Sequence, residues 1–440
     1  MKFRRALAFA FLALGFSATS TFAQNFYWNT ASARSVALGG VYVPASSDVV
    51  DALATNPAGL TYISGRSLDL SLNVVLPRGS FSDSVNNNAQ LSKITGVLPY
   101  GAFGTRIGHS RFTFGVGFVP DLMSVADWHY VDAPGVAGAT YGLQKQKSAI
   151  LAGRAVAGMG VDLGRKLSIG VTLGADYNSN TLDAPYIFQS QPVLKGLKTL
   201  LDLHTTGYGW NGSVGALVRP TRKIELGFAW KSSTVIESYG AASGNVGAQF
   251  AALGLGGVPA SFQYSAQVRN VLPQSALGSV NWRFNPRWLV AFQTDWVNWE
   301  NAFTTLPVTL TKGTNAAING LVNSTTLLDG VPLDWKDQYS FHIGAERLVT
   351  ESSSIRFGYA HGNNPVPSST LTPLTAAILS NQISAGFVYR HGRSTFETSY
   401  AFDPTAQEKV QHSSLLSGEY DNSTVRVGIQ SLMANYSFRF

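Results

Sequence analysis

Histidine, serine and acidic side chains are the residues of this chain that could carry out catalysis or hold a metal. The seven histidines are His109, His129, His204, His342, His361, His391 and His412. None stands in a G-x-S-x-G or H-E-x-x-H motif, the patterns that indicate a serine hydrolase or a zinc site. The sequence also contains no metal-ligand cluster and no phosphate-binding glycine loop. We therefore expect no enzyme, no metal site and no cofactor.

Two basic side chains, Lys231 and Arg356, could bind the carboxylate of a ligand. Each stands at a small or polar position of an alternating segment, and such positions face inward if the segments form a membrane barrel. The alternative is that they pair with inward-facing acids such as Glu225, Glu346 or Glu397, or hold an internal segment in place. The sequence leaves both interpretations open.

Segments with two-residue alternation would position these side chains. Residues 112–118, 224–230, 339–345 and 355–359 each place bulky apolar residues on one face and small or polar residues on the other. A soluble β-sandwich alternates too, with its apolar face inward, so alternation alone does not separate the two architectures. The ends of the chain distinguish them.

Both ends have features of an exported outer-membrane protein. Residues 1–23 combine a basic start, an apolar run over 6–16 and an A-x-A-like site at 21–23, which predicts a signal peptide cleaved before Gln24. Residues 436–440 carry aromatics at alternate positions and end on Phe440, like closing strands that the barrel-assembly machinery reads. An N-terminal anchor and a sandwich edge strand are the alternatives, but the apolar run is short and no polar tail follows.

Composition supports a barrel over helical spans. No later segment offers about 18–20 uninterrupted apolar residues. The 44 glycines argue against long helices, whereas the 51 aromatic residues suit strands and interfacial belts. Cysteine is absent, so an exported domain must be held by other means, such as a closed hydrogen-bonded sheet. Removal of the signal lowers the formal charge from +7 to about +4, which is too weak and scattered to indicate a nucleic-acid partner.

Connection lengths predict the number of strands. A first count gives fifteen, which is odd for a bacterial single-chain barrel. Short turns near residues 109, 164, 220, 285, 350 and 391 alternate with long connections if 261–284 is one strand interrupted at Pro273. The prediction is an all-β, transmembrane antiparallel barrel of fourteen strands over residues 65–440. A change of apolar phase in the last strand predicts a bulge near Gln430 and Ser431.

An irregular segment, residues 24–64, precedes the first strand. It contains Ser35-Val36-Ala37-Leu38-Gly39-Gly40 and then Asn56-Pro57-Ala58-Gly59-Leu60. Further motifs occupy residues 226–232, 334–337, 356–360 and 365–367. In their order and spacing these motifs resemble the FadL family of outer-membrane channels for long-chain fatty acids and other hydrophobic compounds. The resemblance runs from Ala33 to the C-terminus.

The resemblance implies that residues 24–64 form a hatch that plugs the barrel lumen. The family's Asn-Pro-Ala motif belongs to the hatch, so Asn56, Pro57 and Ala58 are carried over as hatch residues. An Asn-Pro pair on its own would otherwise indicate an ordinary turn. The resemblance also implies a kink in the third strand, which opens a gap in the wall through which substrate leaves sideways into the membrane.

Gly115, Gly117 and Pro120 are the residues at which we predict this kink. Glycine weakens a strand, and proline removes a donor from the hydrogen-bond ladder. The alternative is that the glycines are small lumen-facing residues that make room for the hatch. The two interpretations are compatible.

Two external loops are unusually apolar. Residues 190–203 carry leucines at helical spacing, and residues 249–258 carry apolar side chains among Ala and Gly. In the FadL family the corresponding loops form a groove that first captures the ligand. The residues predicted to line it here are Val193, Leu194, Leu197, Leu200, Leu201, Phe250, Leu253 and Leu255. Alternatively, the loops pack on each other and on the plug.

These inferences predict a channel for passive uptake of long-chain fatty acids or related hydrophobic compounds. It would be a monomer in the outer membrane of a Gram-negative bacterium, in contact with membrane lipid and lipopolysaccharide. Aromatic hydrocarbons or alkanes are the alternative substrates. A general diffusion porin is less consistent, because it needs neither a plug nor apolar loops. A barrel hydrolase and a structural or adhesive surface protein are the remaining alternatives.

Overall fold

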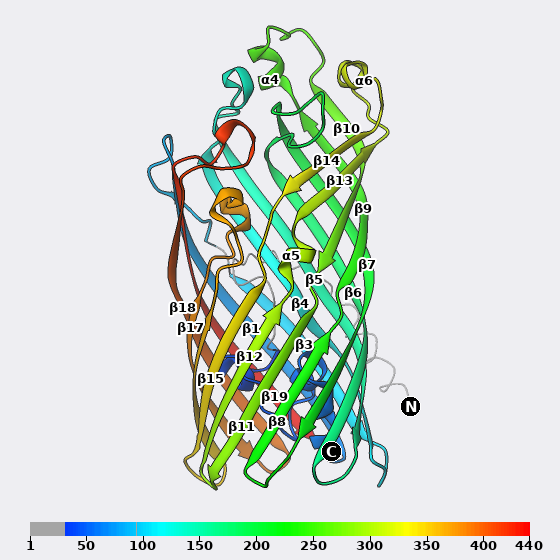
Figure 1. Ribbon diagram of the computed structural model, residues 1–440, viewed down its shortest axis with the longest axis vertical. Helices are drawn as coiled ribbons and strands as arrows, with labels where there is room; N and C mark the ends of the chain where they lie inside the picture. The colour runs from blue at the N-terminus through cyan, green and yellow to red at the C-terminus, as the bar shows by residue number, and fades with distance from the viewer. Residues whose placement is uncertain (1–30, 94) are drawn as a thin grey trace, which may run out of the picture.

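A closed antiparallel barrel surrounds a short N-terminal segment in the computed structural model, which describes residues 31–93 and 95–440 (Figure 1). The first strand, β1 (Arg66–Ser82), pairs with β3 (Gly96–Arg106) on one side and with the last strand, β19 (Ser423–Arg439), on the other. This pairing closes the sheet. The predicted signal peptide lies outside the described residues, and no helix among those residues is long and apolar enough to span a membrane.

The barrel has the predicted fourteen strands over the described residues. The uninterrupted strands are β1, β4 (Phe112–Val131), β5 (Leu143–Asp162), β6 (Leu167–Ile187), β7 (Lys198–Val218), β16 (Ser353–Gly362), β17 (Asn381–His391), β18 (Ser394–Val410) and β19. The interrupted strands are β2 (Ala89–Gln90) with β3, β8 (Ile224–Lys231) with β9 (Thr234–Asn245), β10 (Ser261–Leu272) with β11 (Ser275–Asn285), β12 (Trp288–Val297) with β13 (Thr305–Thr311), and β14 (Leu327–Pro332) with β15 (Gln338–Leu348). The break between β10 and β11 falls at Pro273, as predicted, because proline cannot donate to the ladder.

The two ends of the barrel differ. All six predicted short turns join strands at the end where the N-terminal segment lies (Figure 1). The long connections lie at the other end and carry the helical elements α4 (Gly247–Ala252), α6 (Ala316–Val322), η2 (Val136–Gly138), η3 (Ser368–Thr370), η4 (Pro373–Thr375) and η5 (Leu416–Gly418), while α5 (Trp299–Ala302) interrupts the wall. Short turns face the periplasm in such barrels, so the long loops are external.

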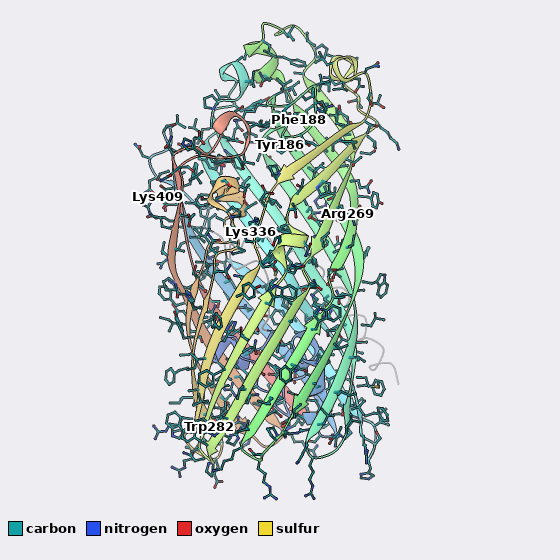
Figure 2. All side chains as sticks on the ribbon, viewed as in Figure 1. Tyr186, Phe188, Arg269, Trp282, Lys336 and Lys409 are labelled. Atoms are coloured by element: carbon teal, nitrogen blue, oxygen red, sulfur yellow. The ribbon has the colours of Figure 1, made fainter. Side chains whose placement is uncertain are left out.

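Apolar side chains of the strands point outward and polar ones point inward, as expected for a barrel with lipid outside and a polar lumen. Phe341 and Phe357 are 61% and 57% exposed on the outer face, whereas Arg356, between two outward residues, is fully buried inside. Outward-pointing side chains, including Trp282 near the turn end, surround the barrel in Figure 2. A soluble sandwich would bury these aromatics instead.

The last strand departs from its prediction. Its register with β1 is continuous through Gln430 and Ser431, so the predicted bulge there is wrong. The bulge lies in the neighbouring β18, between Asp403 and Ala406. The apolar phase changes because Val427 and its neighbours point into an apolar core in the external half of the lumen, while later apolar residues face lipid.

Candidate functional site

The N-terminal segment, here called the hatch (residues 31–64), lies inside the periplasmic half of the barrel (Figure 1). It consists of α2 (Ala33–Ala37), α3 (Val49–Ala54) and the 3-10 helix η1 (Pro57–Tyr62). The α2 helix contacts β16 to β19, α3 contacts β1 and β3 to β5, and η1 contacts β4 to β7. The hatch therefore touches much of the inner wall.

Two short helices of the hatch are tied together by their capping residues. Ser32 caps α2 and donates its hydroxyl to Asp48 and Asp51 at 2.9 and 2.7 Å. Asp48 in turn caps α3, and Asp51 accepts the backbone N–H of Ala31 at 2.7 Å. Burial raises the pKa of both carboxyls, that of Asp48 well above its usual range. Helices this short depend on such bonds, because few intrahelical ones are available.

The Asn-Pro-Ala motif begins η1 and joins it to the wall. The Asn56 side chain accepts the N–H of Ala58 at 3.1 Å, and Pro57 occupies the first helical position, where its fixed φ fits. The Asn56 amide donates to the carbonyls of Ala216 in β7 and Phe228 in β8, at 3.3 and 3.2 Å. Asn56 thus caps the helix and binds two strands at once.

Glycines in the wall admit the hatch backbone. A Cβ at Gly170 of β6 would lie 2.2 Å from the Pro57 carbonyl carbon, and one at Gly358 of β16 would lie 1.9 Å from the Gly39 nitrogen. Real Cβ atoms do not approach backbone so closely, so only glycine fits at these two positions. The hatch backbone therefore meets glycines on two well-separated strands of the barrel, β6 and β16.

Replacement of Gly170 by leucine should displace the hatch. The added side chain has no space beside Pro57, so we expect larger ion conductance through a barrel that still folds. Planar-bilayer recordings would measure this. Gly256→Leu is the matched control, because a Cβ at Gly256 meets no atom within 4 Å. Wild-type conductance in both variants would contradict the prediction.

An ion network fixes the other side of the hatch. Arg34 of α2 pairs with Glu346 of β15 at 3.0 Å, and Glu346 also pairs with Arg356 at 3.0 Å and with Arg390 at 3.7 Å. Arg356 completes the network with Glu397 at 3.1 Å. The interpretation in which Arg356 pairs with lumen acids thus describes this structure, and a ligand role for Arg356 stays a prediction.

The third strand, β4, changes character at Pro120. Up to Phe118 its residues alternate between outward and inward, but Val119 to Leu122 are all buried. The register with β5 shifts between Pro120 and Leu122, so Asp121 is an extra residue in the strand. Beyond Phe118, β4 pairs with β5 but not with β3, and it meets the neighbouring strand again only at the bridge between Trp128 and Leu91 over the described residues. A bulge thus bends the strand inward and leaves a gap in the ladder.

The two predicted glycines lie in the regular part of β4, before the bulge. A Cβ at Gly115 would lie 2.9 Å from the Leu60 side chain of the hatch, and one at Gly117 would lie 2.7 Å from that of Ala102. Of the three residues predicted to form the kink, only Pro120 is at the register shift. Gly115 makes room for the hatch, as in the alternative interpretation, whereas the close neighbour of Gly117 belongs to the wall strand β3.

The gap lies at the level of the lipid. Gly101 of β3 pairs with both Leu70 of β1 and Phe118 of β4, which places the start of the gap beside Leu70. Farther along β1 toward the external end, Leu72 and Leu76 still face outward and are 42% and 47% exposed. The unpaired stretch of the ladder therefore borders the apolar belt of the barrel.

An ion pair crosses the lumen at the bulge. The carboxylate of Asp121 accepts hydrogen bonds from the amine of Lys231, which comes from the seventh barrel strand, and both side chains are buried. Lys231 therefore pairs with Asp121, whereas Glu225 accepts the Tyr62 hydroxyl of the hatch. Ala54 and Thr55 line a small cavity beside this pair, so the residues just before Asn56 are the hatch's neighbours at the kink.

An apolar chamber occupies the external half of the lumen. Its cavity volume is about 170 Å³, and it is partly open to solvent. Its wall includes Leu201, Phe262, Tyr264, Phe303, Trp335 and Leu374. Tyr186 and Phe188, which lie near the external end in Figure 2, also line it. Among the described residues lining the chamber there is no Lys, Arg or His, and the ionisable acids are Asp329 and Glu419.

Neither acid is an open site for a cation. Asp329 accepts five hydrogen bonds, among them the Tyr186 hydroxyl at 2.6 Å and the Ser190 N–H at 2.6 Å. Burial raises the pKa of Glu419 to about 7, although Lys198 lies 3.6 Å away and opposes the shift. Lys198 itself pairs with Asp132 at 2.7 Å. The chamber is therefore apolar with a weakly negative edge.

The structure separates the eight predicted groove residues. Leu200 and Leu201 belong to strand β7, so the predicted helical spacing is not realised, because hydrogen bonds to β6 and β9 extend that strand past the membrane. Only Leu201 lines the chamber. Leu194 and Phe250 are 3% exposed in the apolar cluster around it, together with the partly buried Leu197. The others, Val193, Leu253 and Leu255, are exposed.

Sequence reasoning missed most of the chamber. The connection between β16 and β17 turns inward, and its residues Leu371, Ala377 and Ile378 are buried against β4 and β19. The signal was available, since residues 371–379 are predominantly apolar in a connection expected to be exposed.

A sequence model of the outer membrane protein transport protein family (OMPP1/FadL/TodX) matches residues 14–440. The chain belongs to this family. Membership and the barrel fold indicate a transport protein of the Gram-negative outer membrane and confirm the resemblance inferred from the motifs.

Solved structures of FadL-family proteins share the fold. A Pseudomonas aeruginosa FadL homologue has 17% identity and a TM-score of 0.73, covering 94% of this chain and 99% of that one. The Pseudomonas putida toluene transporter TodX has 18% identity and a TM-score of 0.71, covering 95% and 100%. The Ralstonia pickettii toluene transporter TbuX has 18% identity and a TM-score of 0.70, covering 93% of this chain and 98% of that one. No curated protein sequence matches the chain.

Proposed function

We propose that this FadL-family protein is a passive channel that takes up uncharged hydrophobic compounds and releases them sideways into the outer membrane. The observation that carries the proposal is the chamber: an apolar cavity in the external half, lined without any basic side chain over the described residues. Aromatic or aliphatic hydrocarbons fit this chemistry better than long-chain fatty acids, which the sequence motifs put first.

A fatty-acid carboxylate would find no cation in the described lining of the chamber, where the available donors are uncharged groups such as the Tyr264 hydroxyl. Burying an anion without a cation is costly, and the nearest acids would repel it. Lys198 is the basic residue closest to the chamber acids, but its amine is fully buried and already bound to Asp132. An uncharged ring or chain has no such requirement. The toluene transporters named above have the same fold, which is consistent with the proposal.

The route we propose leads from the chamber along β4 to the gap. Ser124 of β4 lines the chamber, just beyond the bulge at Pro120 and Asp121. Moving an apolar molecule into water costs about 0.8 kcal/mol per CH₂, so a path that ends in lipid is favoured over one that ends in the periplasm. In this scheme the hatch, with Asn56, Pro57 and Ala58 at its wall contact, blocks the aqueous path.

The external loops serve as the entrance in this proposal. Leu194, Leu197 and Phe250 support the chamber wall, and the exposed Leu253 and Leu255 extend apolar surface outward. Lys231 and Arg356 act through their ion pairs on the bulge and the hatch, and we assign them no ligand.

Uptake of labelled toluene and labelled oleate by cells that carry this protein as their channel would test the proposal. We expect toluene uptake to exceed that of cells without the protein, and oleate uptake not to. Leu374→Lys, which adds a cation to the chamber lining, should raise oleate uptake. Val193→Lys on the exposed loop is the matched control. Equal uptake of oleate and toluene by the wild type would overturn the assignment of uncharged substrates.

A further inference from the structure

Three basic side chains gather on the outer face of neighbouring strands. Arg78 of β1, Arg426 of β19 and Lys409 of β18 all point outward, since their strands place Leu76, Gly428 and Gln407 on the same face. Arg78 pairs with Gly428 and Arg426 with Ser80, while Lys409 pairs with Thr424. Such diagonal neighbours lie about 7–8 Å apart, so the three form one basic patch.

The patch differs from three other basic side chains of the external half. Lys145, Arg269 and Lys336 each lie within 4 Å of an acid: Asp127 at 3.6 Å, Glu237 at 3.4 Å and Glu300 at 3.8 Å. Over the described residues, no carboxylate lies that close to Arg78, Arg426 or Lys409. Arg426 donates to Gln407 at 2.8 Å, and Arg78 stacks over Phe402 at 5.6 Å. Both contacts orient a cation without neutralising it.

The patch also lies at a defined height. Toward the external end, the last large apolar residues on the outer face before the patch are Leu76 of β1 and Leu432 of β19. They are 47% and 56% exposed. Lys409 lies well above the middle of the barrel in Figure 2, at a level similar to Arg269 and Lys336. The cations therefore stand just outside the apolar belt, at the level where the phosphates of the outer leaflet begin.

We propose that Arg78, Lys409 and Arg426 form a binding site for the phosphate groups of lipopolysaccharide. Three unneutralised cations, with Arg426 about 7–8 Å from each of the other two, suit a phosphorylated glycolipid whose acyl chains lie against the apolar face below. The neighbouring Gln407 and Ser80 supply uncharged polar groups on the same face. The site is independent of the substrate in the chamber.

Binding of defined lipids to the purified detergent-solubilised protein, measured by native mass spectrometry, would test the site. We expect bisphosphorylated lipid A to bind, and the variant with Arg78→Gln, Lys409→Gln and Arg426→Gln to bind it about tenfold more weakly. The matched control carries Lys145→Gln, Arg269→Gln and Lys336→Gln, which remove the same charge from paired positions. Heat-dependent mobility on gels verifies that each barrel is folded.

Two further probes distinguish the source of the phosphate. Dephosphorylated lipid A should bind the wild type as weakly as bisphosphorylated lipid A binds the patch variant. Inorganic phosphate should not reach the occupancy of lipid A at equal concentration. The proposal is overturned if the control variant loses as much lipid A as the patch variant, if dephosphorylated lipid A binds equally, or if inorganic phosphate alone binds as tightly.

Discussion

Deletion of Asp121, combined with Lys231→Met, should abolish most uptake while the barrel still folds. Pro120 and Leu122 pair with consecutive residues of β5, so removal of the extra residue restores a regular register. A straight β4 would then lie against residues 96–100 of β3 and close the gap, while the bridge between Trp128 and Leu91 beyond it would shift by one residue. The Lys231 change prevents a buried cation from being left without Asp121, which would cost stability for an unrelated reason.

Toluene uptake by cells is the measurement, and we expect about a tenfold loss, because the remaining path runs through water at about 0.8 kcal/mol per CH₂. Asp121→Asn with Lys231→Met is the matched control: it removes the same two charges but keeps the extra residue. This control should retain uptake. Wild-type uptake by the deletion variant would show that substrate does not leave at the third strand.

Barrel architecture was predictable because each of its determinants is local. Phe112 to Phe118 alternate in sequence and in the structure, and Pro273 interrupts a strand in both. Lipid outside and polar groups inside impose the alternation on every strand, so the signal repeats along the whole chain. The hatch motif was placed by resemblance. Gly115 is interpreted from the sequence as a residue that can make room for the hatch, whereas Gly170 is visible there only as part of a high glycine content.

Contacts across the lumen were not predictable. The partner of Lys231 proved to be Asp121, 110 residues away, and the chamber joins residues as distant as Tyr186 and Leu415. No periodicity specifies such pairs, because they depend on which strands face each other after closure. The sequence also did not predict that residues 371–379 turn into the lumen. Apolar residues in a connection between strands are equally consistent with an exposed groove and with a buried packing surface.

Glu346→Gln should release the hatch and raise ion conductance. Glu346 is the acid shared by Arg34 of the hatch and by Arg356 and Arg390 of the wall. In this variant Glu397 is the remaining acid of the network for the three buried or half-buried arginines. Removing one partner of a buried ion pair lowers the free energy of unfolding by about 3–5 kcal/mol. The hatch is the less extensively hydrogen-bonded side of the contact, since Arg34 stands on a five-residue helix while Arg356 and Arg390 belong to the sheet. We therefore expect the hatch to leave the wall, because this change requires less free energy than a distortion of the sheet.

Single-channel recordings in planar bilayers, together with sensitivity of cells to large antibiotics, would measure this release. Arg34→Met removes the hatch side of the contact while Glu346 keeps both wall arginines, although it also removes the Arg34 hydrogen bond to the Val43 carbonyl within the hatch. It should raise conductance with little loss of barrel stability. Glu237→Gln is the matched control: it removes the same charge from an exposed pair with Arg269, and such pairs contribute about 0–1 kcal/mol. If Glu346→Gln lowers the unfolding temperature but leaves conductance at the wild-type level, the network stabilises the wall alone, and the hatch is held by its glycine-lined contacts.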